Sequence, residues 1–171
     1  MEISVFIATT LDGYIARTDD SFDFLKPYEG DPHGYDEFMA TVDALPVGRR
    51  TYETVLAFPA WPFARPVFVL STQPLTSVPP GAVVEAMSGK PGTIKADLEQ
   101  RGFHHIYLDG GVTIQRFLRA GLVDHMIISR VPVLIGGGVP LFGPIENQTT
   151  FPHITTRSYP SGLIQSEYRQ A

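Results

Sequence analysis

Three turns of small or polar residues, each directly after a short apolar segment, constrain the fold of this chain most strongly. They are Val47-Gly48-Arg49-Arg50-Thr51, Val69-Leu70-Ser71-Thr72-Gln73 and Leu108-Asp109-Gly110-Gly111-Val112-Thr113. Short apolar segments without strict alternation are typical of strands buried on both faces. Because helical segments follow the first and third turns, the pattern predicts a largely parallel α/β sheet.

The other elements follow from apolar runs and turn residues. We expect strands at residues 3–8, 44–47, 67–70, 81–87, 105–108 and 122–133, and helices at residues 32–42, 49–58, 93–101 and 112–120. Asp31 is the expected N-cap of the first helix, and Pro32 is its expected first residue. Residues 150–159 and 163–168 flank a turn and predict a C-terminal antiparallel hairpin. Residues 10–32 predict a long irregular loop, which in a compact domain is usually functional or mobile.

Composition excludes several classes of function. The 171 residues predict one domain over 1–171, and they carry 13 Lys and Arg against 18 Asp and Glu, a net charge of −5. That sign argues against general nucleic-acid binding. The absence of cysteine excludes disulfides, thiolate metal sites and cysteine nucleophiles. We see no targeting segment and no apolar run near the ~18 residues of a membrane span, so we expect a cytoplasmic protein.

The three turns together predict an anion site. The carboxyl ends of parallel strands lie along one edge of a sheet, and ligands bind in the crevice there. Gly48, Gly110 and Gly111 allow close approach of the backbone, two of the turns begin helices whose N-termini favour phosphate, and Arg49 and Arg50 add guanidinium groups. Each turn alone is ordinary turn chemistry, but one ligand with several phosphates could contact all three.

Common catalytic motifs are absent. The sequence has no G-x-G-x-x-G after a first strand, no P-loop and no G-x-S-x-G elbow. The five histidines form no H-x-x-x-H pair, so we expect no metal site.

Further segments carry a family resemblance. They are Thr9-Thr10-Leu11-Asp12-Gly13-Tyr14-Ile15-Ala16, Gly48-Arg49-Arg50-Thr51-Tyr52-Glu53, Tyr107-Leu108-Asp109-Gly110-Gly111, Phe117-Leu118-Arg119-Ala120-Gly121-Leu122-Val123-Asp124 and Pro132-Val133-Leu134-Ile135-Gly136-Gly137-Gly138-Val139-Pro140-Leu141-Phe142. As a set they resemble the dihydrofolate reductase superfamily. Within it, the chain is most similar to the reductase (RibD C-terminal) domain of the riboflavin-biosynthesis deaminase/reductase and to its stand-alone relatives. The resemblance runs from Ile3 to Tyr168 and does not include a deaminase half.

This resemblance implies a three-layer fold, with a mixed, mostly parallel sheet, helices on both faces and a C-terminal antiparallel hairpin. It also implies an NADPH-dependent oxidoreductase. Arg49, Arg50, Ser71 and Thr72 would hold the 2′-phosphoadenosine end, and residues 110–113 would cap the pyrophosphate. The full implied cofactor set is Ile7, Ala8, Gly13, Tyr14, Ile15, Gly48, Arg49, Arg50, Thr51, Leu70, Ser71, Thr72, Gly110, Gly111, Val112 and Thr113.

The sequence gives conflicting indications about the substrate. A small pterin- or pyrimidine-like heterocycle is expected, as in folate chemistry or in reduction of 5-amino-6-(5-phosphoribosylamino)uracil. However, residues 12–37 hold eight Asp and Glu against Arg17 and Lys26, the wrong sign for a phosphoribosyl group. Asp36 or Glu37 could bind a pterin-like ring, or could simply favour the helix N-terminus. Tyr52 and Trp61 could line the substrate pocket or pack in the core.

The sequence leaves alternatives open for the proton donor and for the function. Asp109 and Asp12 are candidate acids, because burial would raise a carboxyl pKa, although Asp109 would also serve as a helix N-cap. A catalytically silent NADP(H)-binding scaffold and, less strongly, a flavin or quinone reductase remain alternatives. By analogy with relatives, residues 122–133 and the hairpin predict a homodimer.

Overall fold

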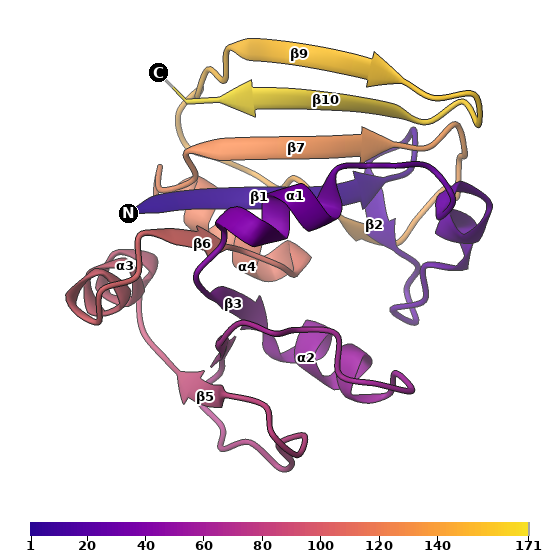
Figure 1. Ribbon diagram of the computed structural model, residues 1–171. Helices are drawn as coiled ribbons and strands as arrows, with labels where there is room; N and C mark the ends of the chain where they lie inside the picture. The colour runs from indigo at the N-terminus through magenta and orange to yellow at the C-terminus, as the bar shows by residue number, and fades with distance from the viewer. Residues whose placement is uncertain (171) are drawn as a thin grey trace.

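Eight strands form one continuous mixed sheet in the computed structural model, which describes residues 1–170 (Figure 1). These strands are β1 (Glu2–Thr9), β3 (Leu45–Gly48), β4 (Val67–Leu70), β5 (Val84–Met87), β6 (His105–Tyr107), β7 (His125–Arg130), β9 (His153–Ser158) and β10 (Ile164–Arg169). Their order across the sheet is β5-β4-β3-β6-β1-β7-β10-β9, and the parallel bridges Ala44–Ile106 and Val47–Asp109 join its three-stranded and five-stranded parts.

The sheet is parallel from β5 to β7 and antiparallel at the C-terminal hairpin. β1 pairs in parallel with both β6 and β7, so it is buried between neighbours as its apolar sequence predicts. β10 pairs antiparallel with β7 and with β9. The mostly parallel sheet with a terminal hairpin is therefore confirmed.

Helices cover both faces of the sheet. They are α1 (Tyr35–Thr41), α2 (Arg49–Leu56), α3 (Pro91–Gln100) and α4 (Gly111–Arg119). Ile106 of β6 packs in a core cluster with α3 and α4, whereas its neighbour Tyr107 packs in a second cluster with α1 and α2. Because successive strand side chains point to opposite faces, these two clusters lie on opposite sides of the sheet. Figure 1 shows α1 crossing in front of β1. The predicted three-layer arrangement is confirmed.

The first helix differs from its expected start. It begins at Tyr35 rather than Pro32, and its N-cap is Gly34, with a φ of +75°. Asp31 does not cap it, because the Asp31 carboxylate accepts a hydrogen bond from the Ser161 hydroxyl in the hairpin turn. The Tyr159 hydroxyl donates to the carbonyl of Pro32 (3.1 Å). These hairpin contacts hold residues 31 and 32 outside the helix.

The segment 10–32 contains more structure than expected. The short strand β2 (Tyr14–Ala16) pairs with β8 (Val139–Pro140), and a 3-10 helix, η1, spans Asp23–Tyr28. Phe24 of η1 is buried against Val131 and Leu163, so this segment packs on its own small core. The strand expected at 122–133 is shorter at both ends, because β7 begins at His125 and ends at Arg130.

Candidate functional site

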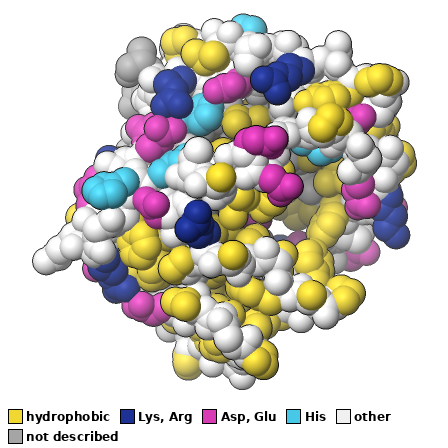
Figure 2. All heavy atoms as spheres, in the orientation of Figure 1, with side chains coloured by type: hydrophobic (Ala, Val, Ile, Leu, Met, Phe, Trp, Pro, Cys, Tyr) yellow, Lys and Arg dark blue, Asp and Glu magenta, His cyan; other side chains and the backbone are white. Residues whose placement is uncertain are grey.

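A cavity of about 600 Å³ lies along the carboxyl-end edge of the parallel strands. It reaches from Leu70 at the end of β4, past Gly48 and Asp109, to Phe6, Ile7 and Ala8 of β1. Figure 2 shows a hollow bordered by hydrophobic side chains to the right of the centre of this face. We call this space the first cavity. Its position matches the crevice in which open α/β sheets bind ligands.

Two of the predicted turns meet at the centre of the first cavity. The N–H of Gly48 donates to the carbonyl of Asp109 (3.1 Å), which joins the β3–α2 turn to the β6–α4 turn. Gly110 has a φ of +100°, and a Cβ there would lie only 2.6 Å from Thr51 Oγ1. A side chain is therefore excluded at Gly110 both by backbone conformation and by space.

Both helix N-termini open onto this cavity. The N-cap residues of α2 and α4 are Gly48 and Gly110, which have no side chain to accept the N–H groups of the first turn. Residues 49–51 and 111–113 line the cavity. Because the first-turn N–H groups of a helix have no intrahelical acceptors, they are available to a bound anion.

Arg49 is held at the β4 end of the cavity. Its Nε donates to Glu53 Oε1 (2.8 Å), and its Nη1 donates to Ser71 Oγ (3.2 Å) and to the Pro74 carbonyl (3.3 Å). The guanidinium and the Ser71 hydroxyl thus form one polar group at the end of β4. This arrangement suits a phosphate beyond the strand end.

Arg50 spans the cavity mouth. Its guanidinium pairs with Asp20 (2.6 Å), which belongs to the loop after β2. The rings of Phe22 and Phe58 make an edge contact at a centroid distance of 6.2 Å, and both residues line the cavity. The 17–22 loop and α2 are therefore in contact across the mouth.

Asp109 lines the cavity with two tyrosines. Burial raises the pKa of Asp109, although a hydrogen bond from the Gly110 N–H (2.7 Å) opposes this effect. Burial also raises the pKa of Tyr35 to about 12, with a further contribution from the nearby Asp109 charge. The Tyr107 hydroxyl donates to the Phe6 carbonyl (2.9 Å). Since Gly110 is the N-cap of α4, the alternative role of Asp109 as that N-cap is wrong.

Most of the predicted cofactor residues come together in the first cavity. Those that line it are Ile7, Ala8, Ile15, Gly48, Arg49, Arg50, Thr51, Leu70, Gly110, Gly111, Val112 and Thr113. The lining does not include Gly13, Tyr14, Ser71 or Thr72, although Ser71 contacts the cavity residue Arg49. Which of them bind a cofactor stays a prediction.

Asp12 lies outside the cavity lining. Its carboxylate accepts hydrogen bonds from the Thr10 hydroxyl (2.6 Å) and from the N–H groups of Ile135 and Gly136 (3.2 and 2.8 Å). The Thr10 hydrogen bond is the main reason that the pKa of Asp12 is lowered. A carboxyl that ionises so readily and holds a loop is poorly suited to donate a proton.

The four predicted substrate residues do not meet at the first cavity. Asp36 and Glu37 line a different space. Tyr52 is buried in the core, where its hydroxyl donates to the Ser77 carbonyl (2.6 Å) and its ring contacts Trp61 (5.9 Å between centroids). The core alternative is thus the one that the structure favours for Tyr52 and Trp61.

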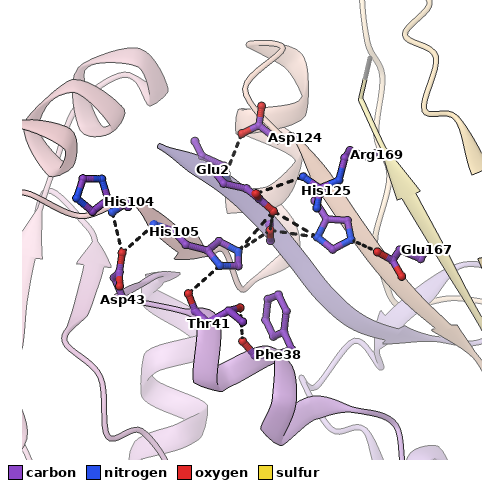
Figure 3. Close-up of polar contacts among 12 residues, drawn as sticks. Glu2, Phe38, Thr41, Asp43, His104, His105, Asp124, His125, Glu167 and Arg169 are labelled. Atoms are coloured by element: carbon purple, nitrogen blue, oxygen red, sulfur yellow. Dashed lines mark hydrogen bonds and ion pairs between the residues drawn. The ribbon is translucent and has the colours of Figure 1, made fainter. Parts of the chain in front are cut away.

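The space lined by Asp36 and Glu37 is a second cavity of about 930 Å³, between α1 and the β7–β10–β9 part of the sheet. A polar network lies at one end of it (Figure 3). The buried Ser4 hydroxyl bonds His105 Nε2 (2.8 Å), and His125 Nε2 bonds Glu167 Oε1 (2.8 Å). In Figure 2, charged and histidine side chains gather in the upper part of the face that is shown. Since Ser4 is fully buried, this network joins strands and offers no accessible nucleophile.

Sequence reasoning missed the aromatic side chains of the first cavity. They are Phe6, Phe22, Tyr35, Phe58, Phe63 and Tyr107. They come from five separate segments, so no local pattern reveals that they meet. Phe6 gives a partial signal, since it directly precedes the predicted residues Ile7 and Ala8.

Comparisons with known proteins agree with this fold. A family model for the RibD C-terminal domain matches residues 92–164. Uncharacterized protein YwjB of Bacillus subtilis is 34% identical over 148 residues, which cover 85% of this chain and 84% of YwjB. A putative riboflavin biosynthesis protein from Shewanella sp. PV-4 is 44% identical, with a TM-score of 0.90 and coverage of 100% of this chain and 99% of that one.

The chain belongs to the RibD C-terminal domain family. The family resemblance expected from the motifs is thereby confirmed. A dihydrofolate reductase from Enterococcus faecalis, solved with NADP(H), is 16% identical, with a TM-score of 0.69 and coverage of 99% of this chain and 96% of that enzyme. This RibD-type domain therefore has the same fold as that dihydrofolate reductase.

Among residues 1–170, no helix combines the length and apolar character needed to cross a bilayer. The expected homodimer and cytoplasmic location stay predictions.

Proposed function

We propose that this chain is an NADPH-dependent reductase that transfers hydride to a small pterin- or pyrimidine-like heterocycle. One observation carries the proposal: the order of chemical groups along the first cavity. Arg49 with Ser71 lies at the β4 end, two glycine-capped helix N-termini lie in the middle, and apolar Ile7, Ala8 and Ile15 lie at the β1 end. This order matches a ligand with a phosphate at one end, a pyrophosphate in the middle and a flat ring at the other end.

The residues of the cavity fit NADPH at each of these places. Arg49 and the Ser71 hydroxyl would hold the 2′-phosphate, because a guanidinium beside a hydroxyl suits phosphate oxygens. The first-turn N–H groups of α2 and α4 would hold the pyrophosphate. The NADP(H) complex of the Enterococcus faecalis enzyme, which shares the fold, supports this choice of cofactor.

The chain itself orients the reactants and excludes water. NADPH, when bound, supplies the hydride. Ile7, Ala8 and Ile15 form an apolar border for its ring, and the aromatic contact of Phe22 with Phe58 closes part of the mouth. Burial raises the pKa of Asp109 at the cavity wall, which makes this carboxyl better suited than Asp12 to donate a proton.

The silent-scaffold alternative requires a cavity that ends where the cofactor ring ends. The lining of the first cavity instead extends beyond Ile7 and Ala8 to Phe6, Tyr35 and Leu25, apolar and aromatic side chains that suit a second flat ring. This observation favours an enzyme over a scaffold.

Transient kinetics test the proposal. NADPH absorbance is followed at high protein concentration after mixing with a panel of dihydropterins and aminouracils. We expect single-turnover oxidation of NADPH with at least one ring, and faster oxidation of NADPH than of NADH. Tight NADPH binding without oxidation by any ring would favour the scaffold.

A further inference from the structure

The guanidinium groups of Arg49, Arg50 and Arg116 line the first cavity, and they differ in their acidic partners. Arg49 pairs with Glu53 (2.8 Å), and Arg50 pairs with Asp20 (2.6 Å). In the part of the chain that the structure describes, no carboxylate forms an ion pair with Arg116. The positive charge of Arg116 is therefore not compensated by the protein and is available to a bound anion.

Arg116 lies beside the end of β5, close to the end of β4. Its Nη2 donates to the carbonyl of Gly89 (2.8 Å), which follows β5. Arg49 Nη1 donates to Ser71 Oγ (3.2 Å) just after β4. The Ser71 N–H in turn donates to the carbonyl of Met87 (2.9 Å), the last residue of β5, so the two strand ends are adjacent. The two guanidinium groups thus lie at neighbouring positions on one edge of the sheet.

Arg49 and Arg116 reach this edge from opposite faces of the sheet. Arg49 is the first residue of α2, which packs on the same face as α1, whereas Arg116 belongs to α4, which packs on the other face with α3. On α4, Arg116 lies four residues after Val112 and three after Thr113, so it shares a side of the helix with these cavity residues. A group bound at the ends of β4 and β5 would lie between the two guanidinium groups.

The charge of Arg49 alone does not balance a phosphate. A phosphate monoester carries roughly −1.5 to −2 charges at pH 7. The Arg49–Glu53 pair has no net charge, because Glu53 keeps a carboxylate beside the guanidinium. Arg116 adds a positive charge, and its Nε and Nη1 donate no hydrogen bond within residues 1–170. These N–H groups lie in one plane and match the geometry of phosphate oxygens.

Arg50 is less suited to this role than Arg116. The Arg50 side chain is 64% exposed, and its guanidinium binds Asp20 at the cavity mouth. Water and salt weaken the attraction between exposed charges. Arg116 is half-buried, so its attraction for an anion is screened less. The adjacency of Arg49 and Arg50 in the sequence therefore does not indicate which second guanidinium assists Arg49.

We propose that Arg116 is a specificity-determining residue that binds the 2′-phosphate of NADPH together with Arg49 and Ser71. This inference rests on the proposed function and deepens it. Arg49 and the Ser71 hydroxyl position the phosphate, and Arg116 supplies the uncompensated charge that favours NADPH over NADH. The hydrogen bond to the Gly89 carbonyl holds Arg116 at the end of β5 before the cofactor binds.

Calorimetric titration with NADPH and NADH, which differ only in the 2′-phosphate, tests this inference. We expect Arg116→Gln to bind NADPH at least fivefold more weakly than the wild type does, and to bind NADH within twofold of the wild type. Unchanged NADH affinity would also show that the cavity is intact in this variant. Arg119→Gln removes the same charge from an exposed position one turn further along α4, and it should leave both affinities within twofold.

The outcomes separate this inference from the proposed function. Equal weakening of NADPH and NADH by Arg116→Gln would place Arg116 at a part that both cofactors share and would overturn the inference. An unchanged NADPH affinity, or an equal loss in Arg119→Gln, would overturn it as well. A wild type that binds both cofactors equally would leave no preference for Arg116 to determine. A wild type that binds neither cofactor would overturn the proposed function itself.

A double variant tests whether Arg49 and Arg116 bind the same phosphate. Contributions of residues that share a partner are not independent, whereas those of separate sites combine by multiplication of their fold-changes. We expect Arg49→Ala/Arg116→Gln to lose less NADPH affinity than the product of the two single losses. A loss equal to that product would show that the two residues act at separate parts of the cofactor and would overturn the shared phosphate site.

Discussion

Arg50 and Asp20 connect α2 to the loop after β2, with Arg50 Nη2 2.6 Å from Asp20 Oδ2. Asp20 has a φ of +66°, so the loop presents this carboxylate from a left-handed backbone conformation. The Asp20 carboxylate binds the Arg50 guanidinium at the N-terminus of α2, beside the proposed position of the pyrophosphate. An anionic cofactor and Asp20 therefore compete for Arg50.

Removal of this competition should strengthen cofactor binding. We expect Asp20→Asn to tighten NADPH binding about two- to fivefold, because a solvent-exposed ion pair is worth roughly 0.2–1 kcal/mol. Asn is the suitable replacement because it tolerates a left-handed backbone. Calorimetric titration with NADPH measures the change. Asp19→Asn removes the same charge at a carboxylate that bonds Ser21, and it should leave the affinity within twofold. Weaker binding of NADPH by Asp20→Asn would show instead that the Arg50–Asp20 ion pair helps to form the cofactor site.

The contact between the two turns should make Gly110 intolerant of a side chain. Gly110→Ala places a Cβ 2.6 Å from Thr51 Oγ1 on a backbone with a φ of +100°. We expect a loss of about 1–3 kcal/mol in the free energy of unfolding and weaker NADPH binding. Urea denaturation measures the loss.

Gly92→Ala in α3 is the matched control, since a Cβ at Gly92 meets no atom within 4 Å. It should be neutral or slightly stabilising, because alanine favours the helix. A Gly110→Ala protein as stable as Gly92→Ala would contradict the geometry of the turns.

The burial of Asp109 should make stability depend on pH in one direction. Its pKa is raised above the ordinary 3.8, so the folded protein keeps this proton to a higher pH than the unfolded chain does. The stability that this group contributes is complete below the unfolded pKa and is lost as the pH rises through the folded pKa. Asp109→Asn should therefore gain stability relative to the wild type over the pH range that begins at the unfolded value of 3.8 and extends upward through the folded pKa. Urea titrations across this range measure the gain, and a difference that does not vary with pH would show an ordinary pKa.

The network at the second cavity should contribute to stability but not to cofactor binding. Ser4 is fully buried and bonds His105 Nε2, so Ser4→Ala leaves a partly buried nitrogen without this partner. We expect a loss of about 1–3 kcal/mol in the free energy of unfolding. Exposed Ser158→Ala should be within about 0.5 kcal/mol of the wild type. A large loss of NADPH affinity in Ser4→Ala would link the two cavities.

The sequence predicts the strand ends well because glycines and apolar runs act locally. The strand Val67–Leu70 and the helix closed by Gly121 appear where the pattern places them. The first helix begins late because Asp31 bonds Ser161, a partner 130 residues away. Local capping rules contain no information about such a contact.

The substrate side was harder to predict for the same reason. Asp36 and Glu37 lie on the first turn of α1 and line the second cavity, whereas Tyr35 lines both. One residue of helix rotation thus decides which cavity a side chain reaches, and the packing of Phe38 under α1 sets that rotation. The sequence of the α1 segment alone does not indicate this rotation of the helix.

Cofactor discrimination tests the central claim most directly. NADPH and NADH are titrated into the wild type, into Arg49→Ala and into Arg119→Ala, which removes a charge at the last residue of α4. The account predicts at least tenfold tighter binding of NADPH than of NADH by the wild type and by Arg119→Ala. In Arg49→Ala, this preference should fall to less than threefold, mainly through weaker binding of NADPH. Equal affinities of the wild type for NADPH and NADH, or a preference unchanged in Arg49→Ala, would contradict the assignment of Arg49 and Ser71 to the 2′-phosphate.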